Sequence, residues 1–186
     1  MPISSYLKSV REKVGHDLLT MTAVSISIFD AEGQLLLGRD AEMDRWTLPG
    51  GGIDPIELPA DAAVRECYEE TGLLVRLDGL IGIFGGPEFL THYPNGDVTY
   101  YTTAAFRGTI VGGAHQPVDG EFAELRYYSQ SECERLHMSP PSRIISRQAF
   151  ASANQAYFAP ASLSISEGRL MLPVRGSRLQ VSFVDR

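Results

Sequence analysis

The feature that most constrains the fold is a run of three glycines, Gly50 to Gly52, followed by a segment that should be helical from about Pro59 to Thr71. Proline suits the first helical turn, where its missing N–H group is no loss, and Gly72 suits the left-handed position that ends a helix. Adjacent glycines let the backbone turn sharply and approach another group closely. The sequence therefore predicts a glycine-rich loop that leads into a helix.

Three glutamates gather on one face of this predicted helix. Glu66, Glu69 and Glu70 stand at positions i, i+3 and i+4. Like charges at this spacing repel by about 0.2–0.5 kcal/mol per pair, and the helix dipole disfavours anions in the last turn. A hard divalent cation such as Mg²⁺ or Mn²⁺ removes the conflict, because it prefers carboxylate oxygen ligands. The opposite side of the helix carries Ala60, Val64, Cys67 and Thr71.

An isolated pair of glutamates at a helix end is usually a solvated surface, but the spacing here argues otherwise. The seven fixed positions are Gly51, Glu57, Arg65, Glu66, Glu69, Glu70 and Gly72, in the pattern G-x5-E-x7-R-E-x-x-E-E-x-G. This pattern resembles the signature box of the Nudix hydrolases, which cleave nucleoside diphosphates linked to a second moiety. Cys67 stands where the family usually has a bulky aliphatic residue, and the run WTLPG from Trp46 to Gly50 leads into the box. The resemblance covers roughly Thr20 to Ala156 and implies an α/β fold, an α/β/α sandwich with a mixed sheet between helices.

The resemblance also implies roles for the residues of the box. It implies Mg²⁺ (or Mn²⁺) as the cofactor, with metal ligands from Glu66, Glu69, Glu70 and the backbone carbonyl of Gly50. Glu57 and Arg65 belong to the catalytic machinery as a pair that braces the loop against the helix and orients its carboxylates.

Members of the family often take a further glutamate, as base or ligand, from a later loop. Glu121, beside Gly120, is the expected residue, with an exposed surface acid as an equal alternative. Glu124 is expected in an ion pair instead, with Arg126 as a candidate partner. Both Glu66 and Glu121 stay open as the general base.

Residues that would bind the rest of a substrate lie outside the box. Arg39 is a candidate for phosphate contact, with a surface ion pair as the alternative. Phe84, Phe89 and Tyr93 are candidates to stack on a nucleobase, with a core role as the alternative. Tyr100 and Tyr101 alternate along a predicted strand, so at most one of them should face the site.

The nature of the substrate rests on weaker signals. Pro87 lies fifteen residues after Gly72, which resembles a position associated with ADP-ribose pyrophosphatases. ADP-ribose or a similar nucleotide conjugate is therefore the first expectation, followed by a nucleoside triphosphate and then a dinucleoside polyphosphate. A nucleotide sensor without turnover is the alternative of a different class, although such domains typically lose glutamates that this box keeps.

Length and composition set the remaining bounds. With 186 residues, of which 44% are hydrophobic, the chain can bury a substantial core. The net charge of −7 argues against a nucleic-acid polymer as partner. Two cysteines give no disulfide framework, and no leader or membrane-spanning run is evident, so a cytoplasmic location without membrane attachment is expected.

The chain divides into three expected parts: an N-terminal helix within residues 1–19, a Nudix hydrolase domain at 20–157, and a strand-rich extension at 158–186. The first helix, Tyr6 to Val14, carries an apolar stripe of Leu7, Val10 and Val14, which must cover either this domain or a partner subunit. Together with the strand-like tail, this helix predicts a homodimer. The other expected strands are 22–30 and 34–39 (as a hairpin), 75–84, 98–106 and 124–128, and in the extension 162–166, 169–174 and 179–184. The other expected helices are 131–136 and 142–156, and 108–120 is expected as a loop.

Overall fold

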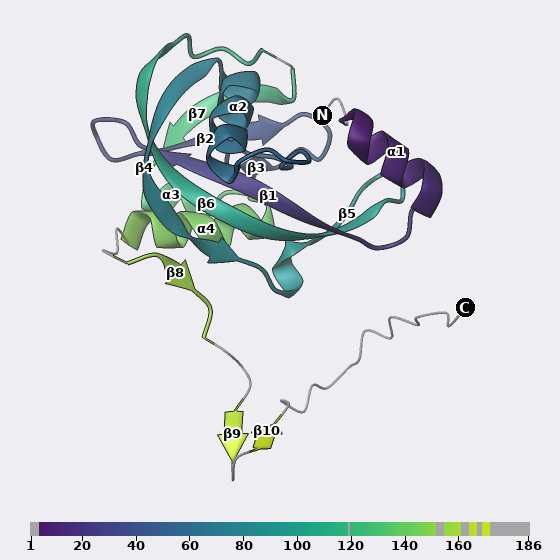
Figure 1. The fold of residues 1–186 in the computed structure, drawn as a ribbon. Helices are drawn as coiled ribbons and strands as arrows, with labels where there is room; N and C mark the ends of the chain where they lie inside the picture. Colours follow the sequence, from purple (N-terminus) through teal and green to yellow (C-terminus); the bar gives the residue numbers. More distant parts are fainter. Residues whose placement is uncertain (1–3, 119, 152–154, 161–163, 167–168, 172–186) are drawn as a thin grey trace.

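The computed structural model describes residues 4–118, 120–151, 155–160, 164–166 and 169–171 (Figure 1). Its helices are α1 (Ser5–Val14), α2 (Pro59–Thr71), α3 (Gln130–Cys133) and α4 (Pro140–Ala151), with a 3-10 turn, η1, at Pro87–Phe89. Its strands are β1 (Leu19–Ile28), β2 (Leu35–Asp40), β3 (Trp46–Thr47), β4 (Leu73–Phe84), β5 (Leu90–His92), β6 (Val98–Gly113), β7 (Phe122–Tyr128), β8 (Tyr157–Phe158), β9 (Ser164–Ser166) and β10 (Arg169–Met171).

The strands β1–β8 form a mixed sheet and a smaller antiparallel one. The five-stranded sheet has the order β1-β6-β4-β8, with β5 also paired to β6. In it β1 runs parallel to β6, and β4 runs antiparallel to β6. The second sheet has the order β3-β2-β7. Long strands with β-branched and aromatic residues fit this pairing, because such side chains pack well on a pleated surface.

Two hydrophobic clusters on opposite faces of the strands make the sandwich. One cluster joins β1 and β2 to α2 through residues such as Ile26, Leu36 and Ala63. The other joins β2 and β4 to α3 and α4 through residues such as Leu37 and Ile145. Figure 1 shows α2 on one side of the strands and α3 with α4 on the other. The expected α/β/α sandwich with a mixed sheet is confirmed.

The expected hairpin of strands 22–30 and 34–39 is wrong beyond its turn. Phe29 and Leu35 form one isolated antiparallel bridge, and the two strands then enter different sheets. The reason is that the second edge of β1 is occupied by the glycine-rich loop. The amides of Val24 and Ile26 donate to the carbonyls of Gly51 (2.9 Å) and Pro49 (2.8 Å).

Other boundaries also differ from expectation. β6 continues to Gly113, where a loop was expected from residue 108, because β4 pairs with it along its length. α3 begins one residue before the expected helix, with Ser129 as its N-cap in a capping box with Glu132. α4 begins at Pro140, so the two prolines lie in its first turn and do not precede it.

The C-terminal part contains the short strands β8, β9 and β10. β8 pairs with β4, and the Tyr157 ring stacks on Phe84 with 5.1 Å between centroids, so the main sheet extends to the proposed boundary at 157–158. β9 and β10 pair with each other within the expected strands 162–166 and 169–174. The expected strand 179–184 lies outside the described residues. Among the described helices, none is long and apolar enough to cross a membrane.

Candidate metal and phosphate site

Helix α2 presents two of its glutamates toward the protein interior. Its bounds are the predicted ones, with Pro59 in the first turn and Gly72 in the left-handed conformation (φ 71) after the last. Glu66 and Glu70 are 4% and 3% exposed, beside the fully buried Cys67. The expectation of separate apolar and acidic sides is therefore wrong in part: Ala60 is exposed, and the buried side carries two carboxylates. Glu70 is buried against the glycine-rich loop, and Glu66 lies against the Arg65 guanidinium.

Glu70 is bonded to that loop directly. Its Oε2 atom accepts a hydrogen bond of 2.7 Å from the amide of Gly50. Gly50 has a φ of 146°, and a Cβ atom there would lie 2.2 Å from the carbonyl oxygen of Val24 and 2.7 Å from the Cα of Ser25. Glycine is therefore required for this close approach of loop to strand, as the three-glycine run predicted.

Arg65 connects the rest of the box. Its Nε and Nη2 atoms donate to the two oxygens of Glu57 at 2.8 and 2.9 Å, and Nη2 also donates to the carbonyl of Gly52 at 3.1 Å. Its Nη1 donates to Glu66 at 2.8 Å and to Glu69 at 3.1 Å. The loop is thus tied to the helix through one guanidinium, an arrangement in keeping with a bracing pair of Glu57 and Arg65.

The electrostatics of the pair and of the buried carboxylate differ. The hydrogen bonds between Arg65 and Glu57 hold the pKa of Glu57 below its ordinary value and raise the pKa of Arg65. Burial is the largest cause that raises the pKa of Glu66 to about 7; the charges of Glu69 and Glu121 act in the same direction, and the hydrogen bond from Arg65 opposes them. A carboxylate in such a setting gains most from a nearby cation.

The donor set fits a hard divalent cation. Glu66, Glu69 and Glu70 offer carboxylate oxygens, Gly50 offers a backbone carbonyl, and two of the carboxylates are buried, where charge requires compensation. Within the described part of the chain, no group of three or more His, Cys, Asp or Glu side chains is already gathered around one point. Arg65 instead joins Glu66 to Glu69, and Glu70 is held by the Gly50 amide.

Glu121 lies in the same cleft as Gly50 and Glu70. The cleft has a volume of about 570 Å³ and is further lined by α1, the turn between β2 and β3, and tyrosines from β5–β6. The carbonyl of Glu121 accepts a hydrogen bond of 3.0 Å from the amide of Ala41 in that turn. The structure therefore brings this residue, distant in sequence, to the box carboxylates.

The candidate substrate-binding residues separate into two groups. Phe84 and Phe89 are 3% and 1% exposed and face each other in the core, so the structure does not place them in the cleft. Arg39 is also outside the cleft, because its guanidinium forms an exposed ion pair with Asp44. Tyr93 does line the cleft, where its hydroxyl lies 2.7 Å from that of Tyr101.

Sequence reasoning missed two arginines that line the cleft, Arg11 and Arg45. Arg11 ties α1 to the sheet by donating to the carbonyl of Val98 (3.1 Å) and the hydroxyl of Thr99 (2.8 Å). Arg45 directly precedes the WTLPG run, and this position was the available signal for it. Neither residue belongs to the box, because each reaches the site through tertiary structure.

Comparison with known proteins agrees with this geometry. The family profile described as NUDIX domain matches residues 19–149. A Bacillus subtilis (strain 168) protein named "Putative 8-oxo-dGTP diphosphatase" is 33% identical over 104 residues, 56% of this chain and 63% of that protein. Human diphosphoinositol polyphosphate phosphohydrolase 3-alpha is 50% identical over 50 residues, 27% of this chain and 30% of that protein.

Solved structures share the fold. A NUDIX hydrolase from Nitrosomonas europaea superposes with a TM-score of 0.59 at 22% identity, over 72% of this chain and 90% of that one. The chain spans less than two thirds of the length of the curated relatives above. The matched region contains the glycine-rich loop, α2 and Glu121. On this profile match and this fold, the chain belongs to the NUDIX domain family.

Proposed function

We propose that this chain is a Mg²⁺-dependent pyrophosphohydrolase that cleaves the pyrophosphate bond of a nucleoside diphosphate linked to another moiety. The observation that carries the proposal is the meeting, in one cleft, of Glu70 bonded to the Gly50 amide and of Glu121 from a distant loop. The buried Glu66 is the third acid of this site. Acids gathered in this way are typical of sites that bind a cation or accept a proton.

The residues divide the work as follows. Glu66, Glu69, Glu70 and the Gly50 carbonyl would hold the metal, and Mn²⁺ is the alternative ion. When bound, the metal supplies charge stabilisation for phosphoryl oxygens and lowers the pKa of a coordinated water. Either Glu66 or Glu121 accepts the proton of the attacking water as the new P–O bond forms and the anhydride P–O bond breaks. Arg65 and Glu57 keep the helix carboxylates in place.

Replacing Glu121 by Gln should lower kcat by about 100-fold, because general-base catalysis contributes on that order. The measurement is steady-state hydrolysis at saturating Mg²⁺, so that weakened metal binding alone is compensated. Glu124→Gln is the matched control, because Glu124 is an exposed acid on β7, three residues away. Equal activities of the two variants would remove Glu121 from the mechanism.

ADP-ribose or a similar conjugate is the first proposed substrate, on the position of Pro87. A nucleoside triphosphate is the alternative, and the printed name of the Bacillus subtilis relative favours it. A dinucleoside polyphosphate comes third. The test is a screen of ADP-ribose, nucleoside triphosphates including 8-oxo-dGTP, dinucleoside polyphosphates and nucleotide sugars, each with Mg²⁺ and with EDTA. Binding of a nucleotide without release of any phosphate-bearing product would favour the sensor alternative.

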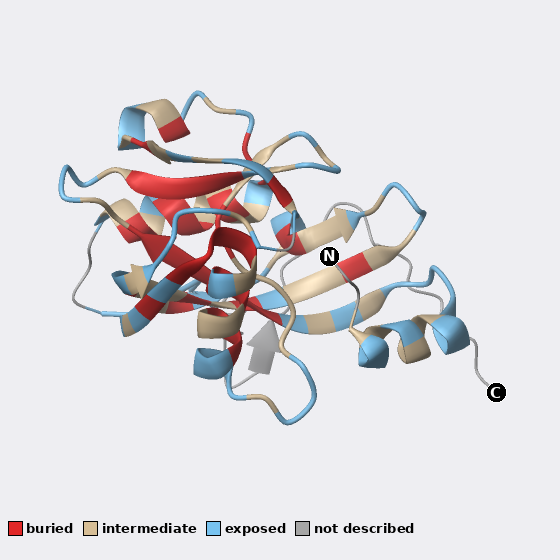
Figure 2. Cartoon of the chain, turned by 90° about the horizontal axis from the view of Figure 1, so that it is seen from above, coloured by how far each residue is buried: buried red, intermediate tan, exposed pale blue. Residues whose placement is uncertain are grey.

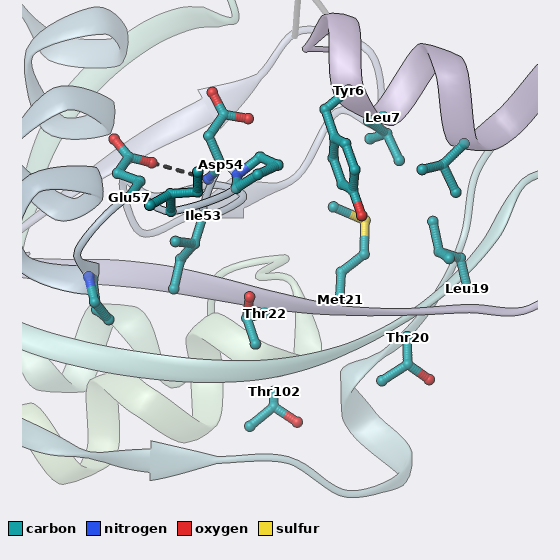
Figure 3. Close-up of a pocket in the computed structure, with 14 residues that line it drawn as sticks. Tyr6, Leu7, Leu19, Thr20, Met21, Thr22, Ile53, Asp54, Glu57 and Thr102 are labelled. Atoms are coloured by element: carbon teal, nitrogen blue, oxygen red, sulfur yellow. Dashed lines mark hydrogen bonds between the residues drawn. The ribbon is translucent and has the colours of Figure 1, made fainter.

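A homodimer is proposed from the apolar groove beside α1. None of the residues of α1 is buried, which Figure 2 shows as exposed and intermediate colour along the helix. A groove of about 550 Å³ lies between α1 and the loop of residues 53–59, and the side chains of Tyr6 and Met21, which line it, point toward one another (Figure 3). Ile56, on that loop, is fully exposed at a φ of 70°, which is strained for a β-branched residue.

Light scattering at micromolar concentration should therefore give twice the mass of one chain. Ile56→Asn should shift the protein toward the monomer, since it removes apolar area and also relieves the backbone strain, so a loss of folding would not explain the result. Leu74→Asn is the control, because Leu74 is exposed on β4, away from the groove. A wild-type protein with the mass of one chain would contradict the proposal.

Two buried free cysteines, Cys67 and Cys133, accord with the further proposal of a reducing, cytoplasmic location.

A further inference from the structure

We propose that Arg45 is a binding residue for the substrate, and that its guanidinium holds a phosphate group in the cleft that Glu70 of α2 also lines. The inference rests on the proposed hydrolase function and names a contact that the box residues do not provide. Arg45 lines the cleft of about 570 Å³ together with Gly50, Glu70 and Glu121. A guanidinium suits this role because its planar donors match the oxygens of a phosphate in pairs.

The backbone holds Arg45 in a fixed place. Its carbonyl accepts a hydrogen bond of 2.9 Å from the amide of Asp40, which closes the turn between β2 and β3. The next residue, Trp46, donates its amide to the carbonyl of His137 at 2.9 Å. The same turn is bonded to the Glu121 segment through the Ala41 amide, at 3.0 Å. The backbone of this turn is therefore held by bonds within the turn, to His137 and to Glu121.

The charge of Arg45 has no partner among the residues that the structure describes. Its Nε atom is buried and makes no hydrogen bond, and its guanidinium enters no ion pair within that part of the chain. Other arginines near the site differ in this respect. Arg65 is bonded to Glu57, Arg11 to Thr99, and Arg39 to Asp44. A buried donor without a partner is unfavourable in the free protein and becomes favourable when an anion binds.

Two of the acids that line the cleft, Asp97 and Asp40, are engaged with other groups. Asp97 is paired with His16 at 2.7 Å and with Arg11 at 3.5 Å. Asp40 accepts hydrogen bonds from the amides of Glu42 and Met43 at 2.9 and 3.1 Å. The Arg45 Nε donor is therefore available to a ligand in the cleft that Glu70 and Glu121 also line. On this proposal one phosphoryl group of a pyrophosphate faces the carboxylates and the other faces Arg45.

The test compares Arg45→Gln with Arg39→Gln. Both remove one arginine charge from the segment formed by β2, β3 and the turn between them, but Arg39 is paired on the surface with Asp44. Arg45→Gln should reduce kcat/KM by about 10- to 100-fold on the best substrate of the screen, since a hydrogen bond to a charged group is worth that much. Arg39→Gln should stay within about twofold of wild type, and Arg45→Lys should fall between them because it keeps the charge without the fork.

Two readouts do not depend on turnover. Calorimetry with inorganic pyrophosphate and Ca²⁺ should show affinity for pyrophosphate lowered by Arg45→Gln and unchanged by Arg39→Gln. The melting temperature of Arg45→Gln should equal or exceed that of wild type, because an unpaired buried donor is removed. A lower melting temperature, or equal behaviour of the two variants, overturns the assignment. A wild type that binds pyrophosphate through Arg45 but hydrolyses no nucleotide would overturn the proposed function and leave this site standing.

Discussion

Hydrolysis should fall by about 1,000-fold or more when Glu70 is replaced by Gln, with the fold intact, because a metal ion contributes several kcal/mol of transition-state stabilisation. Glu70 is 3% exposed, and its Oε2 accepts from the amide of Gly50 at 2.7 Å. Glutamine has the same shape, and its amide oxygen can accept the same hydrogen bond. The substitution therefore removes the negative charge while the hydrogen bond from Gly50 can remain.

The measurement pairs steady-state kinetics with a Mg²⁺ titration of the melting temperature. Wild type should melt higher as Mg²⁺ is added, since a ligand that binds the folded state stabilises it, and Glu70→Gln should show a reduced shift. Asp61→Asn is the control, because Asp61 is an exposed acid in the first turn of the same helix. Full activity in Glu70→Gln would contradict the assignment of this residue as a metal ligand.

Gly50→Ala should destabilise the protein by about 3 kcal/mol or more, through overpacking together with backbone strain. The added Cβ would lie 2.2 Å from the carbonyl oxygen of Val24, and a backbone atom cannot move aside as a flexible side chain can. Any shift of the loop also moves the amide that holds Glu70. Stability and activity should therefore fall together, as measured by chemical denaturation and by hydrolysis.

Gly33→Ala separates the two causes. Gly33 also has a positive φ, 76°, but an added Cβ there meets no atom within 4 Å. Its cost should be about 1–2 kcal/mol, the conformational part alone, with activity unchanged. If Gly50→Ala cost no more than Gly33→Ala, the loop would have enough freedom to yield, and the close approach would not be a requirement.

Local signals predicted the helix of the site and its limits. Pro59 and Gly72 mark both ends of α2, and the carboxylates follow from helical spacing. The burial of Glu66 and Glu70 was not predictable in this way, because helical periodicity shows which residues share a face and not what covers that face. The hairpin failed for a related reason: the Pro49–Gly51 backbone, distant along the chain, competes for the edge of β1.

The wall of the cleft was less accessible to sequence reasoning. Alternation along β4 does not distinguish a core face from a ligand face when both faces are covered. For Phe84 it therefore did not decide between a core role and stacking on a nucleobase. Arg39 lies at the end of β2 and Arg45 in the turn that follows it, and the ion pair with Asp44 distinguishes the surface residue from the cleft residue. Glu121 was found because its loop position in the family is known, whereas the only signal for Arg45 is its place directly before the WTLPG run.

The attachment of the glycine-rich loop to β1 has a consequence for how the protein unfolds. Opening this loop would strip hydrogen bonds from Val24 and Ile26, whose side chains are 2% and 0% exposed at the centre of the core. Amide hydrogen exchange of these residues should then require global unfolding, unlike exchange in an ordinary surface loop. The site has no separate melting of its own, so it persists for as long as the domain does.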